Sequence, residues 1–195
     1  MGVSTSKPIV VNLFAGPGTG KSTSCAQIFS ELKWQGVNCE MAREFAKDKV
    51  WEESFKVLDD QIYIFGKQQH RMKVLIGQVD VIITDSPLLL SIVYDKTENQ
   101  NFKNLVVDTY RQFENINIFL EREKPYNPKG RVQDEDKAKG LDVQVKNLLD
   151  ELNITYATIK GNKEEISRVS TFIKLAVNTK TLHDGDNIKT GNDSI

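Results

Sequence analysis

The amino-acid sequence predicts an α/β fold in which a five-stranded parallel sheet is flanked by helices. Two observations predict this fold. Five short apolar runs alternate along the chain with longer segments whose apolar residues recur at helical spacing. In addition, a glycine-rich turn joins the first apolar run to the first of these helical segments. The chain has 195 residues, of which 39% are hydrophobic, and this is enough for one domain with a substantial core.

The five predicted strands are 8–14 (PIVVNLF), 37–41, 79–84, 117–120 and 154–159. The predicted helices are 24–36, 60–77, 101–113, 134–153 and 163–177, with local helix also expected in 46–58. The stripe expected to face the core in 60–77 consists of Ile62, Phe65, Met72 and Leu75. The stripe in 134–153 consists of Leu141, Val145, Leu148, Leu149 and Leu152. Because strands and helices alternate, we expect helical crossovers between parallel strands.

Residues 1–177 are predicted to form a single domain, because the sequence contains neither an internal repeat nor a second block of alternating elements. The remaining residues, 178–195, are polar and contain glycine but almost no apolar side chains. Too little apolar surface is available there to offset the entropy cost of ordering the chain. We therefore predict a disordered tail.

The composition disfavours several kinds of partner. The net charge of −1 argues against a broad basic surface for polynucleotides. No apolar run approaches the length of a membrane span and no signal peptide is recognisable, so we expect a cytoplasmic protein without membrane contact. Cys25 and Cys39 are expected to be buried and reduced. His70 and His183 have no neighbouring metal ligands in the sequence that would predict a zinc site.

The glycine-rich turn, FAGPGTGKST (14–23), has the spacing of a phosphate-binding loop, G-x-x-x-x-G-K-[ST], with Ala15 in place of the first glycine. Its three glycines allow successive backbone N–H groups to point at anionic oxygens, and the following helix adds its positive N-terminal end. Lys21 is placed to neutralise β- and γ-phosphates, and Ser22 to ligate Mg²⁺. The predicted nucleotide-binding residues are Gly16, Pro17, Gly18, Thr19, Gly20, Lys21, Ser22 and Thr23. This loop indicates a P-loop NTPase fold.

Asp85 directly follows the apolar run VDVIIT (79–84). Open α/β sheets place their ligand chemistry at the carboxyl ends of strands, which is where this carboxylate is expected. We therefore predict that Asp85 holds Mg²⁺ together with Ser22, either directly or through water. The alternative is an ordinary aspartate that begins a turn at Ser86 and Pro87.

The second predicted strand ends beside Glu44, on the side where a phosphoryl acceptor would approach. Glu44 is placed to accept the proton of an acceptor hydroxyl, although Glu40 or Asp85 would serve the same role equally well. In the following segment, Trp51 and Phe55 would either stack on a planar base or, as we favour, belong to the core.

The loop REKPYNPKGRVQ (122–133) places four basic residues around two prolines and a glycine, between a predicted strand and a long helix. A loop of this composition and position resembles a mobile cationic lid that closes over a triphosphate and excludes water. We predict that Arg122 and Arg131 lie on the transferring phosphoryl group, because a guanidinium pairs well with phosphate oxygens. The alternative is a solvated charged loop.

Five segments together resemble a known family: AGPGTGKST, MAREFAKD, VIITDSPLL, REKPYNPKGRVQ and YATIKGN. They resemble the NadR-type, nicotinamide riboside kinase-like group of P-loop AAA and kinase proteins over about residues 10–175. This resemblance implies a nucleoside-kinase-like sheet, ATP with Mg²⁺, and a short lid that carries an arginine. The residues that match the family pattern are Gly20, Lys21 and Ser22 first, and then Asp85, Arg122, Arg131 and Glu44. Proteins of this type in bacteriophages often have this size, so the resemblance is also compatible with a viral origin and the host cytoplasm.

These features lead to two hypotheses about function. The first is an ATP-dependent kinase that transfers a phosphoryl group to a nucleoside or nucleotide, with nicotinamide riboside as the first acceptor to test. The second is a nucleotide-dependent binding module or slow NTPase whose lid reports the nucleotide state to a protein partner. An acceptor site between residues 43 and 75 would favour the first hypothesis.

Overall fold

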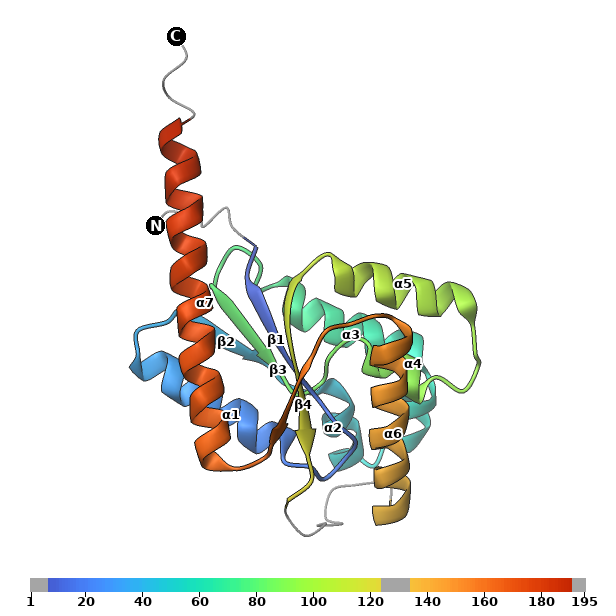
Figure 1. The fold of residues 1–195 in the computed structure, drawn as a ribbon. Helices are drawn as coiled ribbons and strands as arrows, with labels where there is room; N and C mark the ends of the chain where they lie inside the picture. Colours follow the sequence, from blue (N-terminus) through green and yellow to red (C-terminus); the bar gives the residue numbers. More distant parts are fainter. Residues whose placement is uncertain (1–6, 124–133, 191–195) are drawn as a thin grey trace.

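The five strands form one parallel sheet at the centre of the molecule (Figure 1). The computed structural model describes residues 7–123 and 134–190, with side chains described as far as residue 182. The strands are β1 (Ile9–Phe14), β2 (Cys39–Ala42), β3 (Val81–Thr84), β4 (Glu114–Glu121) and β5 (Ala157–Lys160). Their order across the sheet is β2-β3-β1-β4-β5, and every neighbouring pair is parallel. The predicted five-stranded parallel sheet is therefore confirmed.

Helices cover both faces of the sheet. They are α1 (Lys21–Trp34), α2 (Phe45–Trp51), the 3₁₀ turn η1 (Phe55–Asp59), α3 (Gln61–Lys73), α4 (Leu90–Tyr94), α5 (Gln100–Arg111), α6 (Glu135–Glu151) and α7 (Lys163–Thr190). Helices α1 and α7 pack on one face, whereas α3, α5 and α6 pack on the other (Figure 1). Each predicted helix is present, and the short helix α4 is an addition that the sequence pattern did not indicate. Within the described part of the chain, no helix is both long and apolar enough to cross a membrane.

Strand β1 contributes to both halves of the core. Its side chains alternate between the two faces: Ile9, Val11 and Leu13 join the core under α1 and α7. Val10 and Phe14 join the core under α3, α5 and α6. Every residue of the strand is buried, as expected of a central strand with helices on both sides. Because the strands are parallel, their carboxyl ends meet at one edge of the sheet, where the phosphate loop begins.

The buried stripe of helix α3 differs from the prediction. Phe65 and Met72 are buried as predicted, but Ile62 is 63% exposed. Gln61 and Gln68 take buried positions instead. Both glutamine amides donate to main-chain carbonyl oxygens, which makes their burial tolerable. An apolar pattern alone therefore misplaces the face that this helix turns to the core.

The sequence predicts core positions for Trp51 and Phe55, and this prediction is wrong. Trp51 is 63% exposed and Phe55 is 50% exposed. Trp51 ends the short helix α2, and Phe55 begins η1, which buries none of its residues. This segment runs over the surface, so its aromatic side chains have no core to enter.

Residues 178–190 are helical, whereas the sequence predicts a disordered tail for 178–195. Helix α7 continues to Thr190 and projects past the sheet (Figure 1). Lys180 accounts for part of this difference, because its ammonium group donates to Lys7 O at 2.5 Å and pairs with Glu114 on β4. These polar contacts hold the helix where apolar anchors are scarce. Residues 191–195 lie outside the described residues.

Both cysteines are free thiols in the core, as predicted. Burial raises the pKa of the Cys39 thiol to about 11. Burial also raises the pKa of the Cys25 thiol well above its usual value. Both groups are therefore protonated at neutral pH, which makes them weak nucleophiles.

One polar side chain lies inside the apolar strand β1. Asn12 is buried and donates to Asn115 Oδ1 at 2.9 Å and to Asn117 Oδ1 at 3.1 Å, both on β4. Asn117 Oδ1 also accepts a hydrogen bond from the Tyr110 hydroxyl at 2.8 Å. A buried amide is stable only when it is hydrogen-bonded, so this network joins β1 to β4 in addition to the main-chain pairing.

We expect Asn12→Ala to lower the free energy of unfolding by about 1–3 kcal/mol, because the amide oxygens on β4 lose a buried donor. Chemical denaturation followed by circular dichroism measures this change. Asn104→Ala, on the exposed side of α5, is the matched control and should change the free energy of unfolding by at most about 0.5 kcal/mol. Equally small effects of the two substitutions would contradict the stabilising role of the network.

Candidate active site

The segment between β1 and α1 has the conformation of a phosphate-binding loop. Gly18 and Gly20 have positive φ angles of 86° and 103°, which residues with a side chain rarely adopt. Gly20 directly precedes α1, so its backbone turns the chain into the helix. Thr19 is buried, and its hydroxyl donates to Gly16 O at 2.8 Å across the loop. The loop is therefore shaped to present backbone N–H groups and a helix N-terminus to an anion.

Lys21 begins α1 and folds back over the loop. Its ammonium group donates to two carbonyl oxygens of the loop, at 2.8 and 3.0 Å. Burial lowers the pKa of Lys21, and the carboxylates of Glu44, Asp85 and Asp142 oppose this shift. A cation thus lies within the loop, where the charge of a polyphosphate requires one.

The Ser22 hydroxyl donates to Asp85 Oδ2 at 2.5 Å, which joins the first turn of α1 to the end of β3. Asp85 is only 4% exposed. The two predicted metal-binding residues are therefore adjacent, and their oxygen atoms are the kind of ligand that Mg²⁺ prefers. In the part of the chain that the structure describes, no three His, Cys, Asp or Glu side chains gather as a metal site. The pair accordingly suits a cation that takes its remaining ligands from phosphates and water.

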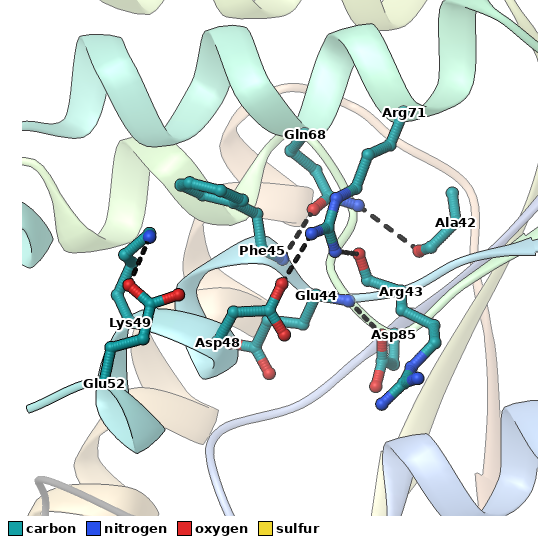
Figure 2. A network of polar contacts seen from close by, with 10 residues as sticks. All are labelled: Ala42, Arg43, Glu44, Phe45, Asp48, Lys49, Glu52, Gln68, Arg71 and Asp85. Carbon is teal, nitrogen blue, oxygen red and sulfur yellow. Dashed lines mark hydrogen bonds and ion pairs between the residues drawn. The ribbon is translucent and has the colours of Figure 1, made fainter.

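The main chain around Glu44 is held by Asp85, which directly follows β3, and by a side chain of α3 (Figure 2). Asp85 Oδ1 accepts a hydrogen bond from Glu44 N at 3.0 Å. Gln68 on α3 accepts from Phe45 N at 3.0 Å and donates to Ala42 O at 3.3 Å. These contacts fix the half-buried Glu44 at the edge of the sheet where the phosphate loop lies.

Arg71 holds the same segment from a second position on α3 (Figure 2). Its guanidinium donates to Arg43 O at 2.9 Å and to Asp48 Oδ2 at 2.5 Å. It also lies 5.2 Å from the centre of the Phe45 ring. The sequence analysis missed Arg71 and Gln68, although a polar residue at a core-facing position of α3 is a signal that would have revealed Gln68.

The three carboxylates considered as a base occupy different places. Glu40 pairs with Lys33 at 3.1 Å in the last turn of α1, roughly 20 Å along that helix from the phosphate loop. Asp85 accepts hydrogen bonds through both oxygens, from Ser22 and from the main chain of Glu44. Glu44 follows β2 and its main chain is hydrogen-bonded to Asp85 beside the phosphate loop, and we choose it as the candidate base because of this position.

Arg122 follows β4 and pairs with Asp142 on α6. Its Nη2 also donates to Ala138 O at 3.0 Å. Asp142 Oδ1 accepts from Gly16 N at 2.5 Å, so this ion pair lies against the beginning of the phosphate loop. Arg131, the other arginine predicted to bind phosphate, lies outside the described residues.

Most of the predicted site residues therefore meet at one edge of the sheet. The residues joined by contacts there are Gly16, Thr19, Lys21, Ser22, Glu44, Asp85 and Arg122. Pro17 is half-buried in the loop, and Thr23 is exposed in the first turn of α1. Asp142, which contacts the loop directly, is a further residue that the sequence analysis missed.

Comparison with protein families identifies the family to which this architecture belongs. A family model described as AAA domain matches residues 10–165, which is most of the chain. The chain belongs to the AAA domain family. The matched range includes the phosphate loop, Asp85 and the whole of α6. No curated protein sequence matches this AAA domain.

Three solved structures resemble the fold of this AAA domain at low sequence identity. A NadR protein in complex with NR has a TM-score of 0.61 and 15% sequence identity. The match covers 80% of this chain but only 46% of the NadR chain. A thymidylate kinase from Ehrlichia chaffeensis has a TM-score of 0.58 and 13% identity, with 88% of this chain and 100% of that chain covered. A deoxyadenosine kinase from M. mycoides, solved with dCMP and dCDP, has a TM-score of 0.50 and 18% identity, with 87% and 99% covered. The kinase-like P-loop fold predicted from the sequence is therefore confirmed.

Helix α6 lies so close to Gly16 that a Cβ atom there would be 2.5 Å from Ala138 O. We expect Gly16→Ala to lower the free energy of unfolding by about 1–3 kcal/mol, because main-chain atoms must move apart. Gly66→Ala in α3 is the matched control: its Cβ would have no neighbour within 4 Å, so it should stabilise the protein by up to about 1 kcal/mol. Thermal unfolding measures both, and an unchanged midpoint for Gly16→Ala would contradict this close packing.

Proposed function

We propose that this AAA domain is a kinase that transfers the γ-phosphoryl group of ATP to a nucleoside or nucleotide. The observation that carries the proposal is the pair of hydrogen bonds made by Asp85, with Ser22 beside the phosphate loop and with the main chain of Glu44. One buried carboxylate thereby connects a nucleotide-binding element to the main chain of Glu44, the residue that carries a second carboxylate. A module that only binds a nucleotide does not require this second carboxylate, whereas a kinase can use it as a base.

The residues of the loop suit ATP. Its backbone N–H groups and Lys21 would hold the phosphates, and Ser22 and Asp85 would hold Mg²⁺. The positive φ angles at Gly18 and Gly20 and the 2.5 Å contact between Ser22 and Asp85 support this assignment. When bound, Mg²⁺ neutralises charge on the phosphate oxygens.

In the proposed reaction, Glu44 accepts the proton of the acceptor hydroxyl while the hydroxyl oxygen forms a bond to the γ-phosphorus. The bond from the γ-phosphorus to the bridging oxygen breaks, and ADP leaves with that electron pair. Lys21 and Arg122 stabilise negative charge on the phosphoryl oxygens, and we assign Arg131 the same role. Binding the acceptor in a fixed orientation beside the phosphate loop contributes further to the rate enhancement.

Nicotinamide riboside is the first acceptor that we propose, because the sequence resembles nicotinamide riboside kinase-like proteins and the fold resembles a NadR protein solved with NR. Nucleosides and nucleoside monophosphates follow, because a deoxyadenosine kinase and a thymidylate kinase share the fold. We place the reaction in the cytoplasm, where ATP and Mg²⁺ are supplied.

The proposal is tested by measuring the rate of ADP formation from ATP in the presence of Mg²⁺. The rate is measured without an acceptor and with each member of a panel of nicotinamide riboside, nucleosides and nucleoside monophosphates. We expect one acceptor to raise the rate by about tenfold or more over the rate without acceptor. Lys21→Ala is the blank, because it removes the cation of the loop and should abolish turnover without changing the circular dichroism spectrum. If ATP binds but no acceptor raises the rate, the kinase proposal is wrong and the binding module or slow NTPase replaces it.

We expect Glu44→Gln to lower kcat by about 100-fold to 10,000-fold for the acceptor that raises the rate in the panel, because the amide cannot accept the hydroxyl proton. Glu40→Gln makes the same chemical change on the neighbouring strand β2, where Glu40 pairs with Lys33, and should alter kcat by less than about twofold. Steady-state kinetics at saturating ATP compares the two variants. A wild-type kcat for Glu44→Gln would exclude Glu44 as the base.

A further inference from the structure

The carboxylate of Asp142 lies between two parts of the site that are far apart in the sequence. Its Oδ1 accepts from Gly16 N at 2.5 Å, and its Oδ2 accepts from Arg122 Nε. The side chains of Arg122 and Asp142 are only 17% and 18% exposed, so solvent screens this ion pair weakly. One side chain of α6 therefore holds both the beginning of the phosphate loop and an arginine of the candidate site.

Helix α6 also holds this arginine at a second point. Arg122 Nη2 donates to Ala138 O at 3.0 Å, one turn before Asp142 on the same helix. Nε and Nη2 are thus both bound to α6, and a planar guanidinium held at two nitrogens has a defined orientation. The contact is tight, because a Cβ atom at Gly16 would lie 3.0 Å from Arg122 Nη2 and 2.9 Å from Asp142 Oδ1.

The surrounding charges indicate that the pair belongs to the phosphate site. Lys21 Nζ donates to Gly16 O at 3.0 Å and Asp142 accepts from Gly16 N, so both side chains contact the same residue of the phosphate loop. Burial is the main cause of the lowered pKa of Lys21; the nearby Arg122 lowers this pKa further, and Asp142 raises it. Asp142 thereby offsets the repulsion between the two cations before a polyanion arrives. Another ion pair of α6, between Glu151 and Lys103 of α5, lies at the C-terminal end of this helix, about two and a half turns from Asp142.

We propose that Asp142 is a positioning residue that orients Arg122 toward the terminal phosphate of bound ATP while it also holds Gly16. The inference rests on the nucleotide-binding part of the proposed function and requires no acceptor. Asp142 acts through Arg122, whose Nη1 is the donor to a γ-phosphate oxygen. Loss of the Asp142 charge should therefore affect ATP, which has this phosphate, more than ADP, which lacks it.

Two substitutions separate the two contacts of Asp142. Asp142→Asn keeps an oxygen that accepts from Gly16 N but removes the charge that pairs with Arg122. Asp142→Ala removes both contacts. Glu151→Gln is the matched control, because it neutralises a carboxylate of the same helix that is paired with Lys103 at 2.7 Å. Isothermal titration calorimetry with ATP and with ADP, each with Mg²⁺, gives two affinities for every variant.

We expect Asp142→Asn and Arg122→Gln each to weaken ATP binding about tenfold and ADP binding by less than about threefold. The double variant should bind ATP no more weakly than Arg122→Gln alone, because the carboxylate acts through the arginine. Asp142→Ala should weaken the binding of both nucleotides, since the loop also loses its contact. Glu151→Gln should change neither affinity.

If Asp142→Asn weakens the binding of ATP and of ADP by the same factor, the inference is overturned, because a residue that only shapes the loop affects the binding of both nucleotides alike. Independent, multiplying effects in the double variant would overturn it as well. If Asp142→Asn does not fold, Arg122→Gln decides the question, and an unchanged preference for ATP over ADP refutes the inference. A failed kinase proposal is recognised separately, by the absence of acceptor-dependent turnover in a protein that still binds ATP.

Discussion

The two hydrogen bonds of the Asp85 carboxylate organise the candidate site. A carboxylate that is 4% exposed has lost most of its hydration, so it requires donors at both oxygens. The Ser22 hydroxyl and the main chain of Glu44 supply these donors at 2.5 and 3.0 Å. Because Asp85 directly follows β3, the sheet fixes the carboxylate, and the carboxylate in turn fixes the phosphate loop relative to the segment that carries Glu44.

Contacts from two helices on the same face of the sheet complete this arrangement. Gln68 and Arg71 of α3 bind the main chain on either side of Glu44 (Figure 2). These contacts fix the backbone from which the Glu44 side chain extends. Asp142 of α6 binds the beginning of the phosphate loop and the guanidinium of Arg122. The groups proposed for nucleotide binding and proton transfer are thus positioned by packed regular elements, which is what catalysis by orientation requires.

The sequence predicts those parts of the molecule that depend on local patterns. The five strands and the phosphate loop are found because apolar runs and glycine spacing are local properties of the chain. The predictions differ from the structure where contacts between residues far apart in the sequence determine the local structure. Gln68 is buried in place of Ile62, and Lys180 pairs with Glu114 of β4 where α7 extends past residue 177. Asp142 is 126 residues from Gly16 in the sequence, and an aspartate on a polar helix face gives no sign of such a contact.

A crystal structure with Mg²⁺ and a non-hydrolysable ATP analogue tests the central claim most directly, because that claim is geometric. We expect the phosphates in the loop of residues 16–23, the metal beside Ser22 and Asp85, and the main chain of Glu44 still hydrogen-bonded to Asp85. Phosphates bound away from this loop, or a metal held by other residues, would contradict the account of the site.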